Sequence, residues 1–326
     1  MMSSVGVNGG DVIEDKDVSR FGRVAVLMGG NSAERSISLL SGNAVLAGLL
    51  RAGVDAVGID VDSTLAEQLR AHNIDRVFNI LHGRGGEDGK LQGFLEILGV
   101  PYTGSGVLAS ALAMDKIKTK LVWQNNGLPT PGCHVLDDST DWEQVVAELG
   151  DLVVKPSHEG SSIGMSMVST AAELKAAYEK ARVYDTAVMA EQRIFGSEFT
   201  VPVINGEVYP AIQLQTTHEF YDFDAKYKAN DTRYTCPAPL TEAKSMELAD
   251  LCLNAFQLLG ASGWGRVDVM QDEDGKFWLL ELNTVPGMTD HSLVPISAAA
   301  CGMSFEALVV KILESSFVTQ KDGGRE

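Results

Sequence analysis

Apolar and polar residues alternate in regular blocks over the first part of this 326-residue chain. Val24-Ala-Val-Leu-Met28 is an unbroken apolar run of the kind found in buried strands, and Gly29-Gly30 ends it. The spacing beyond this run predicts a helix at 35–50, a strand at 54–60, a helix at 64–72 and a strand at 76–81. Strands that alternate with helices form mostly parallel sheets with right-handed crossovers. We therefore expect an open α/β domain over residues 21–115.

A long helical pattern leads out of this domain. Its apolar spacing predicts one continuous helix from about 105 to 126, and Pro129 and Pro131 follow it. Lys116 lies inside this expected helix. By itself an Asp-Lys pair in a helix is most simply read as a solvated turn of that helix.

The rest of the chain reads as two α+β lobes, at 116–200 and 201–326. The elements predicted beyond Pro131 are a strand-helix-strand-loop-strand-helix unit to about 189, short strands to about 214, a helix at 241–259, a hairpin at 264–283 and two terminal helices. An irregular polar and aromatic stretch at 218–239 has the length of a lid or binding loop.

The hairpin carries the most informative polar pattern. Asp274-Gly275 suits a two-residue turn between strand-forming runs. That turn pairs Asp268 with Glu281 and Arg266 with Asn283, so all four side chains share one face. Oxygen ligands of this kind suit Mg²⁺, normally completed by substrate phosphates and water. A solvated strand face with cross-strand ion pairs is the alternative, and the polar turn that follows favours a site.

A glycine- and serine-rich loop follows another buried strand. Lys155 ends the run Leu152-Val-Val and precedes Pro-Ser-His-Glu-Gly-Ser-Ser-Ile-Gly164. Free N–H groups and hydroxyls of such a loop can surround phosphate oxygens, and the lysine adds charge. A surface hairpin loop with an exposed lysine explains this segment equally well. Neither standard glycine-rich nucleotide signature is present in the sequence.

Further polar residues lie where strands end or helices begin, and each has a structural as well as a functional explanation. Glu34 suits the positive end of a helix dipole, and His82 suits a hydrogen-bonded core histidine. Glu191 and Glu198 flank a turn where an adenosine can lie, although carboxylates beside turns are commonly just exposed. Ser292 can cap a helix whose first N–H groups also suit a bound carboxylate.

Composition narrows the class of partners. The net charge of -18 disfavours nucleic acid and anionic membranes, so phosphate-bearing ligands require locally placed cations. No apolar run approaches the ~20 residues that span a bilayer. Residues 1–20 are polar and acidic, which predicts a disordered extension rather than a secretory signal. Four scattered cysteines favour reduced thiols in the cytoplasm.

Taken together, these segments resemble the D-alanine:D-alanine ligase family of ATP-grasp enzymes from about Val24 to Phe317. The shared motifs, in chain order, are Gly-Gly-Asn-Ser-Ala-Glu-Arg (29–35), Leu-His-Gly-Arg-Gly-Gly-Glu-Asp-Gly (81–89), Tyr-Thr-Gly-Ser-Gly (102–106), Met-Asp-Lys (114–116), Lys-Pro-Ser with the serine loop (155–164), Asp-Ala-Lys-Tyr (224–227), Gly-Trp-Gly-Arg-Val-Asp (263–268) and Glu-Leu-Asn-Thr-Val-Pro-Gly-Met-Thr (281–289). The resemblance implies an N-terminal α/β domain followed by a two-lobed ATP-grasp unit.

The resemblance also implies a reaction and a set of residues. ATP phosphorylates one D-alanine, and a second D-alanine attacks the acylphosphate. The implied ATP contacts are Lys116, Lys155, Ser161, Ser162, Glu191, Glu198 and Lys226. The implied ligands of two Mg²⁺ or Mn²⁺ ions are Asp268, Glu281 and Asn283. The implied catalytic residues are Glu34, Ser161, Tyr227, Arg266 and Gly287. The implied substrate contacts are Glu34, His82, Arg266, Ser292 and Leu293.

Other functions stay open at this point. A ligase for D-lactate or D-serine is the nearest alternative, and Lys226-Tyr227 argues against a lactate user. A non-catalytic ATP-binding module is the second, although the metal-ligand set is complete. A dinucleotide oxidoreductase is disfavoured because its glycine fingerprint is missing. Glu191-Gln192-Arg193 departs from the family's usual Glu-Lys-aromatic hinge, which affects nucleotide affinity more than nucleotide identity. The resemblance implies a homodimer.

Overall fold

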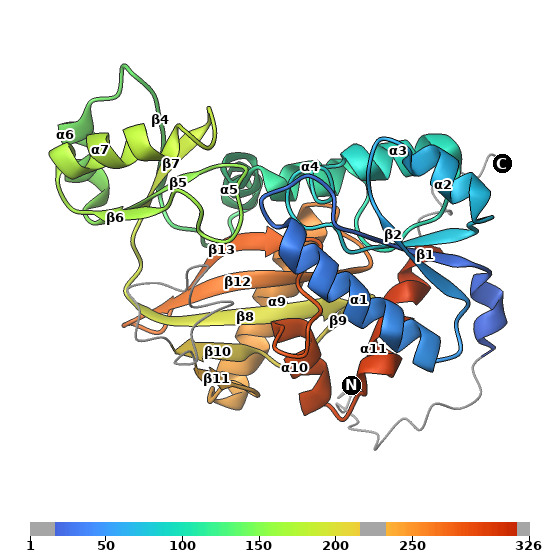
Figure 1. Ribbon diagram of the computed structural model, residues 1–326. Coiled ribbons are helices and arrows are strands. Elements are labelled where there is room, and N and C mark those ends of the chain that lie inside the picture. The colour runs from blue at the N-terminus through green and yellow to red at the C-terminus, as the bar shows by residue number, and fades with distance from the viewer. Residues whose placement is uncertain (1–16, 216–232, 318–326) are drawn as a thin grey trace.

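The computed structural model describes residues 17–215 and 233–317. Its first part is a parallel sheet of order β2-β1-β3 (Figure 1). The elements are β1 Val24–Met28, α1 Arg35–Arg51, β2 Ala56–Asp60, α2 Leu65–Ala71, β3 Arg76–Asn79 and α3 Lys90–Leu98. The parallel α/β arrangement and the element order from β1 to β3 are as predicted, whereas the helix α3 was not predicted.

Side chains of β1 alternate between the two faces of this sheet. Ala25 and Leu27 belong to the apolar cluster that contains α2 and α3. Val24 and Val26 belong to the cluster that contains α1 and the C-terminal helix α11, Phe305–Glu314. Because successive residues of a strand point to opposite faces, a fully apolar strand is expected here.

Residues 17–20, the last part of the predicted disordered extension, are ordered. Val18–Phe21 forms a 3₁₀ helix, Phe21 is buried, and Arg20 pairs with Glu314 at 2.5 Å. Ring contacts hold this segment in place, because Phe21 stacks on Phe317 with centroids 5.4 Å apart. Residues 1–16 lie outside the described part of the chain.

The single long helix predicted at 105–126 is wrong. The structure has α4, Val107–Met114, and α5, Lys116–Asn125, separated at Asp115. Asp115 takes an extended conformation with ψ 97°, and its carboxylate accepts hydrogen bonds from Lys118 N and Ser157 Oγ. Aspartate favours this N-cap geometry because its side chain satisfies a free N–H of the first turn. Lys116 therefore begins a helix instead of lying inside one.

The central lobe is an antiparallel sheet of order β4-β7-β5-β6 covered by two helices. Its elements are β4 Cys133–Leu136, α6 Trp142–Leu149, β5 Leu152–Pro156, β6 Ser166–Val168, α7 Ala171–Ala181 and β7 Val188–Gln192. Leu152 and Val154 of β5 and Leu174 of α7 are buried in its apolar cluster. The element order agrees with the predicted one.

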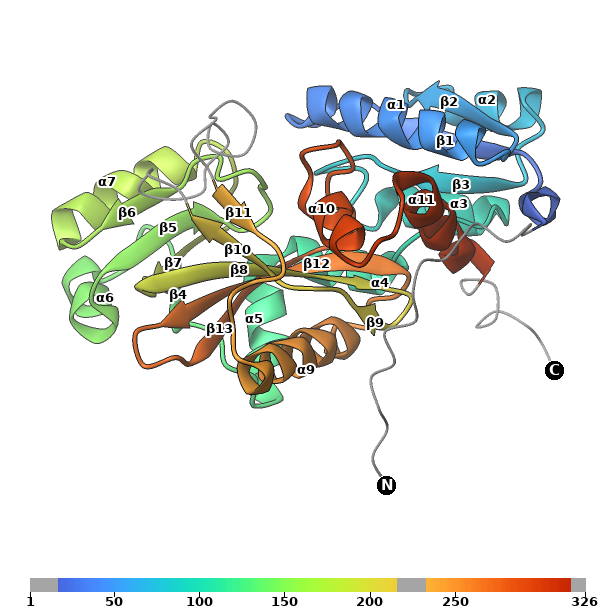
Figure 2. The same cartoon turned by 90° about the horizontal axis from the view of Figure 1, so that it is seen from below.

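The C-terminal lobe is a second antiparallel sheet, of order β11-β10-β8-β12-β13 with β9 paired to β8. Helix α9 lies on one face of this sheet, as Figure 2 shows from below, and its Leu248 and Phe256 belong to the apolar cluster beneath the sheet. Its elements are β8 Gly196–Ile204, β9 Glu207–Val208, β10 Ile212–Gln215, β11 Arg233–Thr235, α9 Glu242–Leu258, β12 Trp264–Asp272 and β13 Phe277–Asn283. Part of the stretch expected to be irregular, 218–239, is thus the strand β11.

The hairpin β12–β13 has the predicted register at its polar end and a different turn. Asp268 pairs with Glu281 and Arg266 with Asn283, whereas Val269 pairs with Leu279. Gly275 has φ 79° and its N–H bonds Asp272 O, so the loop is one residue longer than predicted. A register shift beside Asp268 restores the pairing.

The last two helices pack both on the first domain and on the C-terminal sheet, where Leu293 joins the apolar cluster of Ile212 and Leu214. Helix α10, Leu293–Ala300, and α11 lie beside α1 in both views (Figures 1 and 2), and Leu308 and Val309 join the cluster of Val45 and Leu49. Among the described residues no single helix has the length and apolar character to cross a bilayer, and only the pair α10–α11, bent by 107°, meets both criteria together.

One close backbone contact joins the first domain to β12. Gly263 has φ 67°, and a Cβ there would lie 2.8 Å from Gly104 Cα. We predict that Gly263→Ala lowers the free energy of unfolding by about 2–4 kcal/mol, because left-handed strain adds to a clash between backbones.

Gly260→Ala is the matched control for this prediction. Gly260 has φ 71° and nothing within 4 Å of the added Cβ, so only strain remains, about 1–2 kcal/mol. Urea unfolding of both variants measures the difference. Equal destabilisation of the two variants would contradict the clash.

Candidate active site

A cavity of about 330 Å³ opens between the central and C-terminal sheets. The central sheet contributes Lys155 and Glu191, and the C-terminal sheet contributes Asp268 and Glu281. Predicted residues that line this one cavity are Lys116, Lys155, Ser161, Ser162, Glu191, Glu198, Asp268 and Glu281. The fold therefore collects residues that lie up to 165 positions apart in the sequence, from Lys116 to Glu281.

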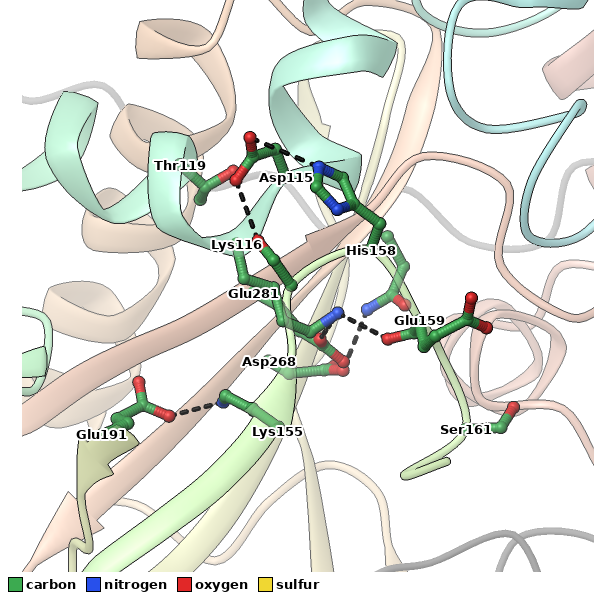
Figure 3. A network of polar contacts seen from close by, with 12 residues as sticks. Asp115, Lys116, Thr119, Lys155, His158, Glu159, Ser161, Glu191, Asp268 and Glu281 are labelled. Atoms are coloured by element: carbon green, nitrogen blue, oxygen red, sulfur yellow. Dashed lines mark hydrogen bonds and ion pairs between the residues drawn. The ribbon is translucent and has the colours of Figure 1, made fainter. Parts of the chain in front are cut away.

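Lys155 and Glu191 face each other on the neighbouring strands β5 and β7. Lys155 Nζ donates to Glu191 Oε2 at 2.5 Å (Figure 3). Burial alone would lower the pKa of Lys155, but Glu191 and Glu281 hold that pKa above its usual range. Burial alone would raise the pKa of Glu191, and Lys120 and Lys155 hold it below its usual range. Both groups are thus charged at neutral pH.

Asp268 is the most heavily bonded carboxylate of the hairpin. Arg266 donates to it twice, Nε to Oδ1 and a terminal nitrogen to Oδ2, both at 2.9 Å. Asn283 Nδ2 donates to Oδ2 at 2.9 Å, and Thr200 Oγ1 of β8 donates to Oδ1 at 2.5 Å. The predicted polar face exists, and Arg266 neutralises Asp268 within it.

Lys116 reaches the other carboxylate of the hairpin. Its Nζ lies 3.2 Å from Glu281 Oε2 and donates to Glu159 O at 2.9 Å. The helix break at Asp115 permits this contact, because Lys116 N also bonds Ser157 O of the serine loop at 3.2 Å. Figure 3 shows Lys116 between Glu281 and this loop.

The serine loop closes toward the first domain. Ser161 and Ser162 have φ 52° and 59°, an uncommon backbone conformation for residues other than glycine. Ser161 Oγ donates to Glu34 Oε1 at 2.5 Å. Glu34 stands at the N-cap of α1 but makes no side-chain cap bond, so capping does not explain its position.

His82 lies in the interior between α1 and the loop after β13. Its Nδ1 bonds Val285 O at 2.8 Å, and its Nε2 bonds Ser41 Oγ at 3.2 Å. Burial lowers the pKa of His82, so the ring is neutral near pH 7. Both ring nitrogens of His82 are therefore hydrogen-bonded to other protein groups. A contact of His82 with the substrate stays a prediction.

The turn after the hairpin places Gly287 beside the start of α10. A Cβ at Gly287 would lie 2.9 Å from Ser292 Oγ. Ser292 Oγ also accepts a bond from Thr289 N at 2.9 Å. Leu293 begins α10, so its N–H is one of the first-turn groups without an intrahelical acceptor.

Comparisons with known proteins agree with this arrangement. Residues 122–314 match the family described as D-ala D-ala ligase C-terminus, and residues 61–105 match D-ala D-ala ligase N-terminus. The chain belongs to the D-alanine–D-alanine ligase family. It is 59% identical over 305 residues to "D-alanine--D-alanine ligase" of Pseudomonas putida, a match that covers 93% of this chain and 96% of that one.

Further relatives and solved structures give the same result. The "D-alanine--D-alanine ligase" of Saccharophagus degradans is 56% identical over 93% of this chain and 97% of its own length. The crystal structure of D-alanine–D-alanine ligase from Bacillus anthracis superposes with a TM-score of 0.83 at 34% identity and covers 93% of this chain and 99% of that chain. The same Bacillus anthracis ligase complexed with ATP gives a TM-score of 0.81 at 32% identity, with coverage of 93% and 99%.

Two predicted family residues are outside the described part of the chain. Lys226 and Tyr227, expected on the lid, lie in 216–232. Their roles stay predictions, as do the site roles of the described residues.

Sequence reasoning missed Glu87, which fixes two loops of the site. Its carboxylate accepts from Gly83 N at 2.6 Å and Val285 N at 3.1 Å. Burial raises the pKa of Glu87 to about 8, and the carboxylate of Glu34 adds to the rise. The motif His-Gly-Arg-Gly-Gly-Glu contains this residue, and only a three-dimensional arrangement shows that it reaches Val285.

Arg84 was also missed, and it joins the first domain to the central lobe. Its Nε lies 2.8 Å from Glu159 Oε1, and another nitrogen lies 3.6 Å from Asp185 Oδ1. Glu159 of the serine loop thus contacts Arg84 through its carboxylate and Lys116 through its backbone oxygen. We predict that Arg84→Ala increases amide-hydrogen exchange in peptides spanning 157–164 by up to about fivefold, since partly exposed ion pairs contribute up to about 1 kcal/mol.

The dependence of the exchange rate on ionic strength distinguishes the loss of the Arg84 ion pairs from a loss of side-chain packing. The Arg84 side chain is 46% exposed, so about 0.5 M salt should remove most of the difference from the wild type. Arg70→Ala on the exposed side of α2 is the control and should exchange like the wild type. A difference that persists unchanged in high salt would contradict the ion-pair explanation.

Proposed function

We propose that this cleft joins two D-alanine molecules to D-alanyl-D-alanine, with ATP converted to ADP and phosphate, for peptidoglycan precursor synthesis. The observation that carries the proposal is one cavity lined by two lysines, by two carboxylates of the hairpin and by Ser161, which donates to the Glu34 carboxylate of another domain. Family membership across nearly the whole chain supports the same reaction.

The reaction balances in two steps. A carboxylate oxygen of the first D-alanine attacks the γ-phosphorus of ATP, and ADP leaves. The amine of the second D-alanine then attacks the carbonyl carbon of the D-alanyl phosphate. The tetrahedral species collapses, phosphate leaves with the original carboxylate oxygen, and the amine loses a proton. A closed cleft is needed because water would otherwise hydrolyse the acylphosphate.

The nucleotide would lie between the two sheets. Lys116 and Lys155 would contact its phosphates, since each has a charged ammonium on the cavity wall. Glu191 would accept a hydrogen bond from the adenine edge, and Glu198 would contact the ribose. Ser161 and Ser162 belong to the loop that would cover the phosphates, with Lys226 reaching the γ-phosphoryl from the lid.

The hairpin residues fit a divalent cation that is held jointly with phosphates. Asp268, Glu281 and Asn283 offer oxygen donors of the type that Mg²⁺ and Mn²⁺ prefer. The described residues contain no cluster of three or more acidic, cysteine or histidine ligands, so phosphate oxygens would have to complete the coordination. When bound, two such ions would neutralise the charge of the phosphoryl group during transfer.

The amino-acid substrates would occupy the side of the cleft nearest the first domain. Glu34 would hold the ammonium of the first D-alanine, with His82 near its carboxylate. Arg266 and the Gly287 N–H would stabilise the oxyanion. Ser292 and the Leu293 N–H would bind the second carboxylate. Ser161 and Tyr227 would contact each other across the closed lid.

The broader organisation is proposed on the same basis. The chain would comprise a substrate domain at 21–115 and two ATP-grasp lobes at 116–200 and 201–326. It would form a homodimer, work in the cytoplasm and bind neither nucleic acid nor a membrane.

A coupled ADP-release assay tests the proposed reaction. ADP should appear with ATP, Mg²⁺ and D-alanine, and the rate should fall to background with L-alanine. Adding D-lactate as the second substrate should give at most a minor depsipeptide product. Preference for D-lactate, or ADP release independent of any amino acid, would replace this proposal with one of the alternatives.

We predict that Glu281→Gln leaves the protein folded and lowers kcat by about 100-fold or more, because a neutral amide replaces an anionic ligand of the metal that would neutralise the phosphoryl group. Circular dichroism checks the fold and phosphate release measures the rate. Glu273→Gln, in the exposed turn of the same hairpin, is the control. Near-normal turnover of Glu281→Gln would remove the metal role from this residue.

We predict that Lys155→Ala raises the KM for ATP by about 10- to 100-fold, since a hydrogen bond to a charged group contributes roughly 1.5–3 kcal/mol. The KM for D-alanine should change little. Lys175→Ala, on the exposed side of α7, should match the wild type for both substrates. An unchanged KM for ATP in Lys155→Ala would refute the phosphate contact.

A further inference from the structure

A third lysine, Lys120, lies near the cavity and does not line it. Lys120 follows Lys116 by one turn of α5, and its side chain is fully buried at 0% exposure. Its Nζ forms an ion pair with Glu191 Oε1 and donates to Thr130 Oγ1 at 2.6 Å. Thr130 Oγ1 in turn donates to Leu279 O of β13 at 2.8 Å. Lys120 therefore joins α5, β7 and β13 from inside the protein.

The charges of this cluster do not balance. Glu191 carries one negative charge, and it contacts the two ammonium groups of Lys120 and Lys155. Lys155 alone would neutralise Glu191, so Lys120 adds one ammonium group more than the contacts of Glu191 balance, while the charge of Glu281 acts on Lys155 from the hairpin. Burying an ammonium costs free energy unless its charge is compensated. A local excess of positive charge suits a cavity that receives an anion.

The two lysines differ in what they can do when an anion arrives. Lys155 lines the cavity and can turn toward a phosphate, whereas Lys120 is enclosed and cannot follow it. As Lys155 turns to a phosphate, its contact with Glu191 weakens. A buried carboxylate left without a cation would take up a proton or hold Lys155 back.

We propose that Lys120 is a positioning residue for nucleotide selection: it keeps Glu191 an ionised hydrogen-bond acceptor for the base while Lys155 is released to the phosphates. This inference rests on the proposed function, because it assumes that ATP occupies the cavity. It adds a group that touches neither the nucleotide nor the amino acids.

The charge of Glu191 affects which base the cavity accepts. An ionised carboxylate only accepts hydrogen bonds, so Glu191 suits the 6-amino group of adenine and repels the 6-keto oxygen of hypoxanthine. A protonated carboxyl can donate to that keto oxygen. Losing Lys120 should therefore weaken ATP binding and reduce the discrimination between ATP and ITP.

Steady-state kinetics of Lys120→Met with ATP and with ITP test the inference. Methionine keeps much of the side-chain volume and leaves Glu191 paired one-to-one with Lys155, so the variant should fold with a Tm near that of the wild type. We expect the KM for ATP to rise about tenfold, and the ratio of kcat/KM for ATP to that for ITP to fall by about tenfold. The KM for D-alanine should stay within about twofold, because no amino-acid contact is removed.

Lys118→Met is the matched control, since Lys118 is an exposed lysine on the same helix. It should reproduce the wild-type KM and the wild-type ratio. An unchanged ratio of kcat/KM for ATP to that for ITP in Lys120→Met would overturn the inference. A fall in kcat and Tm without a change in this ratio would also overturn it, because that result indicates a purely structural role for Lys120.

A second variant and the wild type complete the test. If Lys120→Met does not fold, Thr130→Val replaces it, because this variant removes the hydroxyl that bonds Lys120 Nζ. The ratio of kcat/KM for ATP to that for ITP should fall in Thr130→Val as well, by a smaller factor. An unchanged ratio in Thr130→Val would equally overturn the inference. The wild type is assayed in parallel. Absence of D-alanine-dependent ADP release from it would refute the proposed function, whereas an active wild type with an unaffected Lys120→Met refutes only the role of Lys120.

Discussion

Mutual compensation of charge inside the cleft is the interaction on which the rest of this structure depends. Three carboxylates that line the cavity have a cation beside them: Glu191 has Lys155, Glu281 has Lys116 and Asp268 has Arg266. Low-dielectric surroundings make an unpaired charge costly, so these pairs fix how α5, β5, β7 and the hairpin meet. Under the proposed function, the lysines of these pairs would turn to the phosphates of ATP, and the carboxylates that they leave would become available to a divalent cation.

Local backbone features place these charges where the exchange is possible. The break at Asp115 ends one helix and starts another, which turns Lys116 toward Glu281. The shifted register beside Asp268 keeps Asp268 opposite Glu281 although the hairpin loop is one residue longer than a two-residue turn. Ser161, in a left-handed conformation, brings the serine loop within hydrogen-bonding distance of Glu34. Small irregularities of the backbone therefore assemble a site from three separate sheets.

Sequence patterns predicted the parts of the fold that depend on local periodicity. The apolar runs located every strand of the parallel sheet, and the alternation within β12 and β13 identified the polar face with Asp268 and Glu281. The helix break at Asp115 was missed, because its partner Ser157 is 42 residues away. Glu87, Arg84 and Lys120 were missed for the same reason: each acts through a contact to a distant segment. The packing of α11 on α1 likewise depends on tertiary contacts that no local pattern encodes.

An oxygen-transfer experiment tests most directly whether ATP and two D-alanines react in one cleft through D-alanyl phosphate. The protein is incubated with ATP, Mg²⁺ and D-alanine labelled with ¹⁸O in its carboxylate, and the released phosphate is examined by mass spectrometry or ³¹P NMR. The account predicts one labelled carboxylate oxygen in each phosphate for every dipeptide formed. Phosphate that contains no label while dipeptide accumulates would contradict it.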